Sequence, residues 1–148
     1  MKNGEVCNHT VIIVDPDTSL EVAAKLMREQ HAGSLVVVDN LERRVSVGMI
    51  TDRDIVVEVL AAGLDYRSVK VGEITADALV TAREEDDSLD TLSVMGQRGV
   101  RRVPVLTAAG SLAGIVALDD LLGIVVEELD RIVRSIGKEQ YRESARRR

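Results

Sequence analysis

The sequence has almost no aromatic residues. Among 148 residues there is no Phe or Trp, and the only aromatic rings besides histidine belong to Tyr66 and Tyr141. The core must therefore be built from Val, Leu, Ile, Ala and Met, and recognition of nucleic-acid bases by aromatic stacking is disfavoured. The single cysteine, Cys7, excludes an internal disulfide, and with only His9 and His31 beside it a Cys/His zinc site is excluded as well. We interpret Cys7 as a buried or incidental thiol rather than a reactive one.

Long apolar runs are also missing. No run reaches the roughly 18 apolar residues of a membrane span, and the first residues lack the apolar core of a signal peptide. These features predict a cytoplasmic protein without a membrane partner. With 45% apolar and 30% charged residues, the chain is expected to be globular, as one ordinary domain or two small units that share a core.

The net charge of -6 is unevenly distributed. Residues 131–148 carry seven basic and two acidic side chains, whereas the other 130 residues carry 12 basic and 23 acidic ones. An acidic body disfavours nucleic acid as the main ligand. We interpret the basic tail as a solvated helix end, with contact to an acidic partner as the alternative.

An internal repeat organises the chain. Thr18–Asn40 aligns with Asp87–Ala109 at an offset of 69 residues, and Gly48 aligns with Gly114 at an offset of 66. Each copy predicts helix, strand, turn, strand and helix, with a short strand before the first helix in residues 11–14 and 78–82. Neither copy has enough helix to cover both faces of its sheet. The expected fold is therefore α/β (α+β), with two β-α-β-β-α repeats packed through their sheets about a pseudo-twofold axis.

The local signals within the repeat are specific. Thr18 is predicted to cap the first helix of copy one, with Glu21 completing a capping box. In copy two, Leu89 and Met95 are expected to face inward. Pro104 lies within a strand pattern, so its position is predicted to be an edge or a bulge.

The stretch GMITDRD and its copy GIVALDD carry the candidate chemistry. Thr51 lies where a strand ends and a helix begins, so it can cap the helix, and the free N–H groups there favour an anion. Asp54 is about one helical turn later and shares a face with Thr51. This pair suits a phosphate and a ribose diol, although an ordinary helix cap is the alternative. The copy has Ala117 in place of the hydroxyl and keeps the acid as Asp120.

The repeat resembles a tandem pair of cystathionine β-synthase (CBS) domains, called a Bateman module. The matching features are HAGSLVVVD with VGMITDRD, and RGVRRVPVL with LAGIVALDD, within Val11 to Glu128. We expect a stand-alone CBS protein with one CBS domain in residues 1–66, a second in 67–128, and a basic helical extension in 129–148.

The resemblance implies binding of adenosyl ligands, with AMP or ATP favoured and ADP, NAD or S-adenosylmethionine as alternatives, and no required cofactor. Thr51 would contact the phosphate and Asp54 the ribose, while the adenine lies between apolar strand residues. The second copy lacks the hydroxyl, so two unequal sites are expected. The remaining candidates are Val11, Gly33 and Ser34 as walls of the first site, Arg101 and Arg102 for phosphates in either cleft, and Asp120 and Pro104 in the second copy.

The resulting hypothesis is a non-catalytic regulatory sensor, with two alternatives. In the first, the protein is a pure assembly module, because Leu122, Val125, Leu129, Ile132 and Ile136 form an apolar seam at 3-4-3-4 spacing. This seam also predicts a homodimer, which would act on an effector protein that the sequence does not identify. In the second, the DRD stretch binds Mg²⁺ in a nucleotide-processing enzyme. That is disfavoured, since carboxylates at i and i+2 on a helix point about 200° apart.

Overall fold

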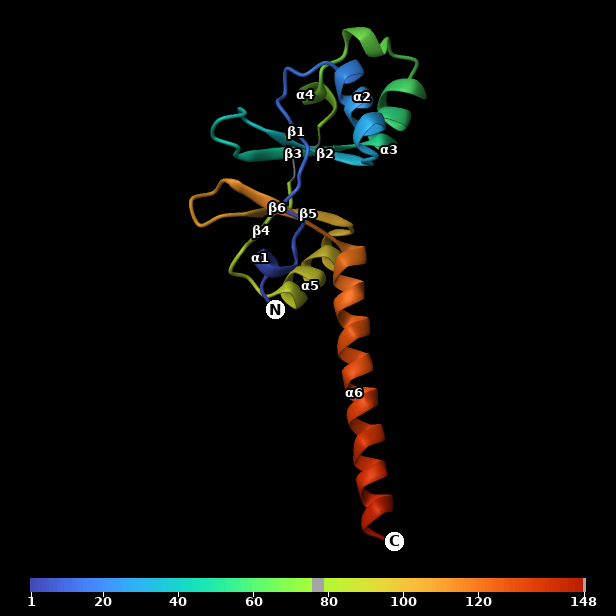
Figure 1. Cartoon of the computed structure of the whole chain (residues 1–148). Coiled ribbons are helices and arrows are strands. Elements are labelled where there is room, and N and C mark those ends of the chain that lie inside the picture. The colour runs from blue at the N-terminus through green and yellow to red at the C-terminus, as the bar shows by residue number, and fades with distance from the viewer. Residues whose placement is uncertain (76–78, 148) are drawn as a thin grey trace.

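Two three-stranded sheets lie face to face in the computed structural model, which describes residues 1–75 and 79–147. Figure 1 shows a first unit above, with its helices on the outer face of its sheet, and a second unit below it with the same arrangement. In both sheets the middle strand pairs in parallel with the short first strand and antiparallel with the third. The predicted α+β fold of two repeats packed through their sheets is confirmed.

The first unit follows the predicted order, with short helical turns added after its last helix. Its sheet has the order β1-β2-β3, and a π-helical segment (η1) directly continues α3. Its elements are β1 (Ile13–Val14), α2 (Leu20–Gln30), β2 (Ser34–Val38), β3 (Ser46–Thr51), α3 (Asp52–Ile55), η1 (Val56–Leu60), the 3-10 turn η2 (Tyr66–Ser68) and α4 (Val71–Ile74).

The second unit repeats this order and ends in a much longer helix. Its sheet has the order β4-β5-β6. Its elements are α1 (Asn3–Val6), β4 (Ala82–Arg83), α5 (Ser88–Arg98), β5 (Arg102–Leu106), β6 (Leu112–Ala117) and α6 (Leu118–Arg146). A short strand precedes the first helix of each repeat as predicted, but β1 occupies only the second half of residues 11–14 and β4 overlaps residues 78–82 only at Ala82, while Ala78 lies outside the described residues.

Aliphatic side chains build the core, as the shortage of aromatic residues requires. Each unit has its own buried cluster between sheet and helices, containing Leu20 and Ile50 in the first and Met95 and Leu121 in the second. A third cluster joins the two sheets and consists of buried Val36, Val38 and Leu112 with partly buried neighbours. The shared core expected between the sheets is therefore present.

The two units exchange their first short helices. Helix α1 lies in the second unit, where the buried side chain of Asn3 donates to the Arg83 carbonyl at 3.0 Å and to Thr91 at 2.8 Å. Helix α4 lies in the first unit, where Val71 is fully buried. The sequences KNGEV and KVGEI begin these two helices and are 68 residues apart. The repeat therefore starts earlier than Thr18, while the domain boundaries at 66 and 128 stay predictions.

The repeat offset in the first half of each copy is 68, not 69. Helices α2 and α5 begin and end 68 residues apart, and both middle strands have a bulge at positions 68 residues apart. This places Met95 opposite Met27 and Ser88 opposite Leu20, and all four are buried. The prediction that Leu89 faces inward is wrong, since it is 58% exposed one position past the buried row.

Two local predictions also need correction. Pro104 is buried in the central strand β5 rather than at an edge, and the bulge falls one residue later, between Val105 and Leu106. The strand tolerates proline because β4 pairs with β5 only from Val105 onward. Ser19, not Thr18, caps α2, and its hydroxyl accepts from the Val22 N–H at 3.2 Å.

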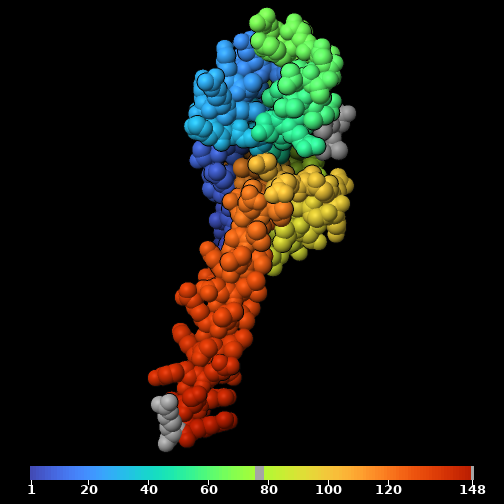
Figure 2. All heavy atoms as spheres, turned by 90° about the vertical axis from the view of Figure 1, so that its right-hand side faces the viewer, coloured from blue at the N-terminus to red at the C-terminus, as the bar shows by residue number. Residues whose placement is uncertain are grey.

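Helix α6 leaves the body of the protein. Its first turns pack against the second unit through Leu118, Leu121 and Ile124, and every described residue from Val126 onward is exposed. At 29 residues the helix is about 43 Å long, and Figure 2 shows it as a stalk that projects from the two stacked units. No helix in the described part of the chain is long and apolar enough to span a bilayer.

Candidate ligand clefts

A first cleft lies between the two units, beside the strand-to-helix junction of the GMITDRD stretch. Its volume is about 480 Å³. We call it cleft 1. Its lining residues are Met49, Thr51, Asp52, Arg53 and Asp54 from the first repeat and Leu79, Val80, Gly99, Val100, Arg101 and Arg102 from the second.

Thr51 and Asp54 are joined by reciprocal hydrogen bonds at the start of α3. The Asp54 N–H donates to the Thr51 hydroxyl at 3.1 Å, and the Thr51 N–H donates to Asp54 Oδ2 at 2.9 Å. These bonds are the capping box that β3 running into α3 requires. Among the described residues no further protein donor reaches Asp54, so its Oδ1 and the Thr51 hydroxyl proton are available to a ligand. The cap and the binding pair are therefore compatible, and the half-buried position of both residues is fixed by the cap.

Arg101 and Arg102 face cleft 1 from the other repeat. Both are exposed, and Arg101 is 3.4 Å from Asp119 in a surface ion pair that contributes little to stability. Arg102 lines both clefts, whereas Arg101 lines cleft 1 but not cleft 2. Guanidinium groups beside a hydroxyl and a helix start form a donor set that suits a phosphate.

A second cleft of about 270 Å³ repeats this arrangement with the two repeats exchanged. We call it cleft 2. The Ala117 N–H donates to Asp120 Oδ2 at 3.2 Å, as in cleft 1, but Ala117 provides no hydroxyl at this junction and Asp120 is exposed. Its lining residues are Asn8, Thr10, Val11, Ile12, His31, Ala32, Gly33, Ser34 and Val36 from the first repeat and Arg102, Ile115, Ala117 and Asp120 from the second.

The predicted site residues are gathered, but in a different grouping. Val11, Gly33 and Ser34 were expected to wall the site of Thr51 and Asp54, yet they line cleft 2. The reason is the sheet-to-sheet packing, which brings the junction of each repeat against the opposite repeat. Pro104 lines neither cleft. It is buried in β5, where it pairs with Ile115 of β6.

Sequence reasoning missed the apolar wall of cleft 1. Leu79, Val80 and Val100 line it and are all half-buried. The correct offset of 68 would have found them, because it places Leu79 on Val11 and Val80 on Ile12, which line cleft 2. The same shift places Arg101 and Arg102 on Gly33 and Ser34, so small residues in one cleft correspond to cations in the other.

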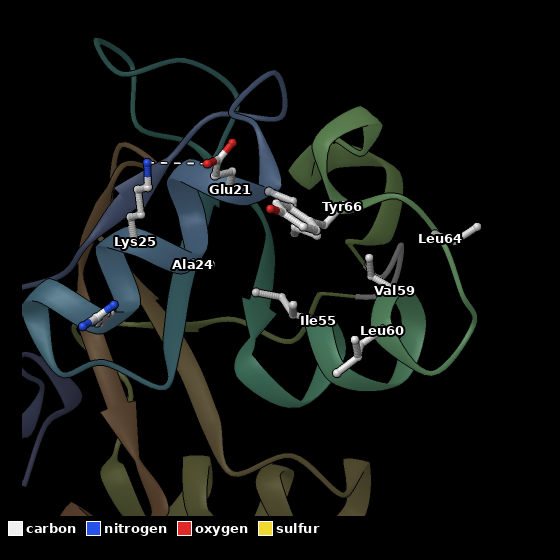
Figure 3. Close-up of a pocket in the computed structure, with 10 residues that line it drawn as sticks. Glu21, Ala24, Lys25, Ile55, Val59, Leu60, Leu64 and Tyr66 are labelled. Atoms are coloured by element: carbon white, nitrogen blue, oxygen red, sulfur yellow. Dashed lines mark ion pairs between the residues drawn. The ribbon is translucent and has the colours of Figure 1, made fainter.

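A third hollow of about 380 Å³ lies on the outer side of the first unit, away from both clefts. Figure 3 shows Ile55, Val59 and Leu60 on one wall, with Tyr66 at one end and the Glu21–Lys25 ion pair on the rim. None of the predicted site residues lies in it. Its walls are mainly hydrocarbon, so it is a packing surface rather than a phosphate or ribose site.

Carboxylates are plentiful near the clefts, but they are dispersed. Asp52 Oδ1 accepts from the Arg53 N–H at 2.8 Å, whereas Asp54 turns back to the Thr51 N–H. In residues 1–75 and 79–147 no group of three or more His, Cys, Asp or Glu side chains is placed to hold a metal ion. Burial raises the pKa of the Cys7 thiol, which lies in the core of the second unit away from the cleft walls.

The fold and the paired clefts define a protein of two β-α-β-β-α repeats stacked through their sheets. The family model of the CBS domain matches twice, over residues 4–61 and 71–127. The chain therefore belongs to the CBS domain family, as a tandem pair, and the predicted resemblance is confirmed.

Two relatives show how far the sequence similarity extends. An uncharacterized protein of Methanopyrus kandleri, MK0525, is 34% identical over 122 residues, which span 82% of this chain and 61% of the relative's length. Hypoxic response protein 1 of Mycobacterium tuberculosis is 37% identical over 117 residues, which span 79% of this chain and 80% of that protein.

Solved structures share the fold. Hypoxic Response Protein I with two coordinated zinc ions has a TM-score of 0.73 at 35% identity, covering 82% of this chain and 97% of that one. The cytosolic domain of the Mg²⁺ channel MgtE in complex with ATP has a TM-score of 0.71 at 25% identity, covering 83% of this chain and 48% of that one. CBSX2 in complex with AMP has a TM-score of 0.71 at 23% identity, covering 85% of this chain and 96% of that one. At this identity the similarity shows the fold alone.

Proposed function

We propose that the protein is a non-catalytic regulatory module that binds an adenosyl ligand, AMP or ATP first, in the clefts between its two CBS repeats. The observation that carries the proposal is the composition of cleft 1. Both repeats contribute to one hollow of about 480 Å³, which is lined by the Thr51 hydroxyl, the Asp52 and Asp54 carboxylates, and the guanidinium groups of Arg53, Arg101 and Arg102. Small-ligand pockets have volumes of roughly 300–1,000 Å³.

The ligand's parts match the groups in cleft 1. Asp54 Oδ1 accepts from a ribose diol, the Thr51 hydroxyl and the arginines contact the phosphate, and the adenine lies against the Leu79, Val80 and Val100 side chains. ATP is the ligand of one structural neighbour, the cytosolic domain of MgtE. NAD and S-adenosylmethionine are the alternatives, because they share the adenosine and differ beyond it.

Cleft 2 is proposed to be the weaker site. Its junction has Ala117 in place of a hydroxyl, its acid Asp120 is exposed, and its volume is smaller at about 270 Å³. Asp119 adds a negative charge beside Asp120, which opposes a phosphate there.

The absence of catalysis is proposed from the DRD stretch. Asp52 and Asp54 both belong to α3, and their carboxylates accept from different backbone N–H groups, so they do not form a bidentate cation site. The match of the chain to a methanogen inosine-5'-monophosphate dehydrogenase covers only 23% of that enzyme, which leaves most of it outside the shared region.

A homodimer is proposed as the working assembly, acting on an effector protein. Its support is the apolar surface left exposed on the first unit, where Val56, Val57 and Leu60 are 47–73% exposed and Leu60 lines the hollow of Figure 3. Contiguous apolar patches mark interaction sites. The cytoplasmic location expected from the sequence stays a prediction.

Titration calorimetry tests the ligand. We expect AMP or ATP to bind, and Asp54→Asn to bind about tenfold more weakly, because it removes one charge-assisted hydrogen bond while keeping an oxygen for the helix cap. Asp52→Asn is the matched control, since it makes the same charge change two residues away in the same cleft, and it should bind as wild type does. No binding of AMP, ATP, NAD or S-adenosylmethionine to wild type, or equal affinity in Asp54→Asn, would refute the proposal.

A further inference from the structure

Helix α6 has an exposed apolar stripe with no partner in the described part of the chain. We call it the α6 stripe. Its members are 51–66% exposed, all on one face of the projecting helix: Leu122, Val126, Leu129, Ile132, Val133 and Ile136. Two ion pairs, Glu128–Arg131 and Asp130–Arg134, lie outside this stripe. A helix with an apolar stripe and charges elsewhere is built to pair with another helix.

The stripe has the same spacing in both chain directions from Leu129. Toward the C-terminus, apolar residues follow at three, four and seven positions, as Ile132, Val133 and Ile136. Toward the N-terminus they also follow at three, four and seven positions, as Val126, Val125 and Leu122. A second α6 laid antiparallel across Leu129 would therefore meet an apolar residue at every level.

The charges of α6 are divided at the same point. Residues 118–130 contain five acids and no base, whereas residues 131–146 contain five bases and two acids. Antiparallel pairing places the acidic half of each helix beside the basic half of the other. Parallel pairing would place like charges together along the whole length, which is unfavourable.

The size of the stripe suits a second copy. Burying six such side chains removes roughly 100 Å² of solvent-accessible surface per side chain. For two helices the buried surface is about 1,200 Å², which is the lower bound for specific interfaces. The tip of a lone helix has no tertiary packing, and tertiary packing supplies most of a helix's stability.

We propose that α6 pairs antiparallel with α6 of a second copy, with Leu129 at the twofold axis and Leu122 opposite Ile136 of that copy. The inference rests on the proposed homodimer and gives it a contact on α6, which is separate from the exposed apolar surface of the first unit. It places the basic end of each helix beside the acidic first turns of α6 of the other copy.

Disulfide crosslinking distinguishes the two orientations. Leu122→Cys and Ile136→Cys are made separately, with tags of different size, and are also co-expressed. We expect oxidation to give a crosslinked dimer containing one chain of each kind, and none from either variant alone, because facing positions of paired helices come within disulfide reach. Co-expression of Leu122→Cys with Lys138→Cys, which lies on the opposite side of the helix, is the matched control and should not crosslink. Wild type controls for the native Cys7, which is 7% exposed.

Each other outcome overturns the inference. Crosslinking of either single variant alone indicates parallel pairing, and the lack of a mixed crosslink indicates that α6 does not pair. Both substituted positions are more than half exposed, so the fold is expected to survive, and circular dichroism verifies this. Calorimetry with AMP and ATP on the same samples tests ligand binding separately from α6 pairing. Ligand binding to wild type does not depend on which α6 residues crosslink, so either proposal can fail without the other.

Discussion

Gly114 is the position where a single methyl group should disturb both the fold and one cleft. It lies in β6, paired with Val105, and a Cβ added there would meet the Asn8 carbonyl oxygen at 2.7 Å and Cys7 Sγ at 2.8 Å. The Asn8 backbone cannot move freely, because it exchanges two hydrogen bonds with Ile115 at 2.8 and 3.0 Å. We therefore predict that Gly114→Ala strongly destabilises the second unit.

The magnitude follows from these close approaches. Overpacking a well-filled site costs about 1–3 kcal/mol. If the N-terminal segment moves away instead, the two Asn8–Ile115 hydrogen bonds are lost, at about 0.5–1.5 kcal/mol each. By either route the expected loss in the free energy of unfolding is about 1–3 kcal/mol. Asn8 and Ile115 also line cleft 2, so a ligand there should bind more weakly while binding in cleft 1 is retained.

Urea unfolding followed by circular dichroism measures the free energy. Gly123→Ala is the control, since nothing lies within 4 Å of its added Cβ and it lies inside α6. It should stabilise the protein by up to about 1 kcal/mol, because alanine favours a helix over glycine. A Gly114→Ala protein within about 0.5 kcal/mol of wild type, the range of an ordinary surface substitution, would refute the reasoning.

Two further predictions test the site and the repeat offset. Ala117→Thr restores the missing hydroxyl of cleft 2, so calorimetry should show tighter binding at the weaker site, and unchanged binding there would contradict the proposed role of Thr51. Met95→Ala should lower the free energy of unfolding by about 2–5 kcal/mol, whereas Leu89→Ser should change it by no more than about 0.5 kcal/mol; equal effects in urea titrations would favour the offset of 69.

The sequence predicted the fold well because its signals are local. The strand and helix patterns and the strand-to-helix junctions at Thr51 and Ala117 depend on a few neighbouring residues, and all are present. The offset error arose from matching Leu20 with Leu89 by identity, where burial instead relates Leu20 to Ser88. Alignment by residue type fails where one repeat fills a core position with a small polar side chain.

The clefts were harder to predict, because they depend on which surfaces meet. The pairing of Thr51 with Asp54 follows from spacing along one helix, but the opposite wall comes from residues 25 or more positions away in the other repeat. No local pattern shows that Val11 and Gly33 line the same cleft as Asp120. The exchange of α1 and α4 between the units was missed for the same reason, since it is a property of the packing.

This dependence on both repeats limits how strongly a ligand could act. A ligand in cleft 1 would touch Thr51 from one repeat and Arg102 from the other, so its affinity depends on how the two sheets sit. It shifts that arrangement only by its difference in affinity between the alternatives. One charge-assisted hydrogen bond that forms in only one arrangement supplies about a tenfold preference, whereas a switch from 1:99 to 99:1 needs about 10⁴-fold. A full switch in this protein would therefore require several such hydrogen bonds at once. Cleft 1 can supply them, whereas cleft 2, which has Ala117 in place of the junction hydroxyl, can supply them only in part.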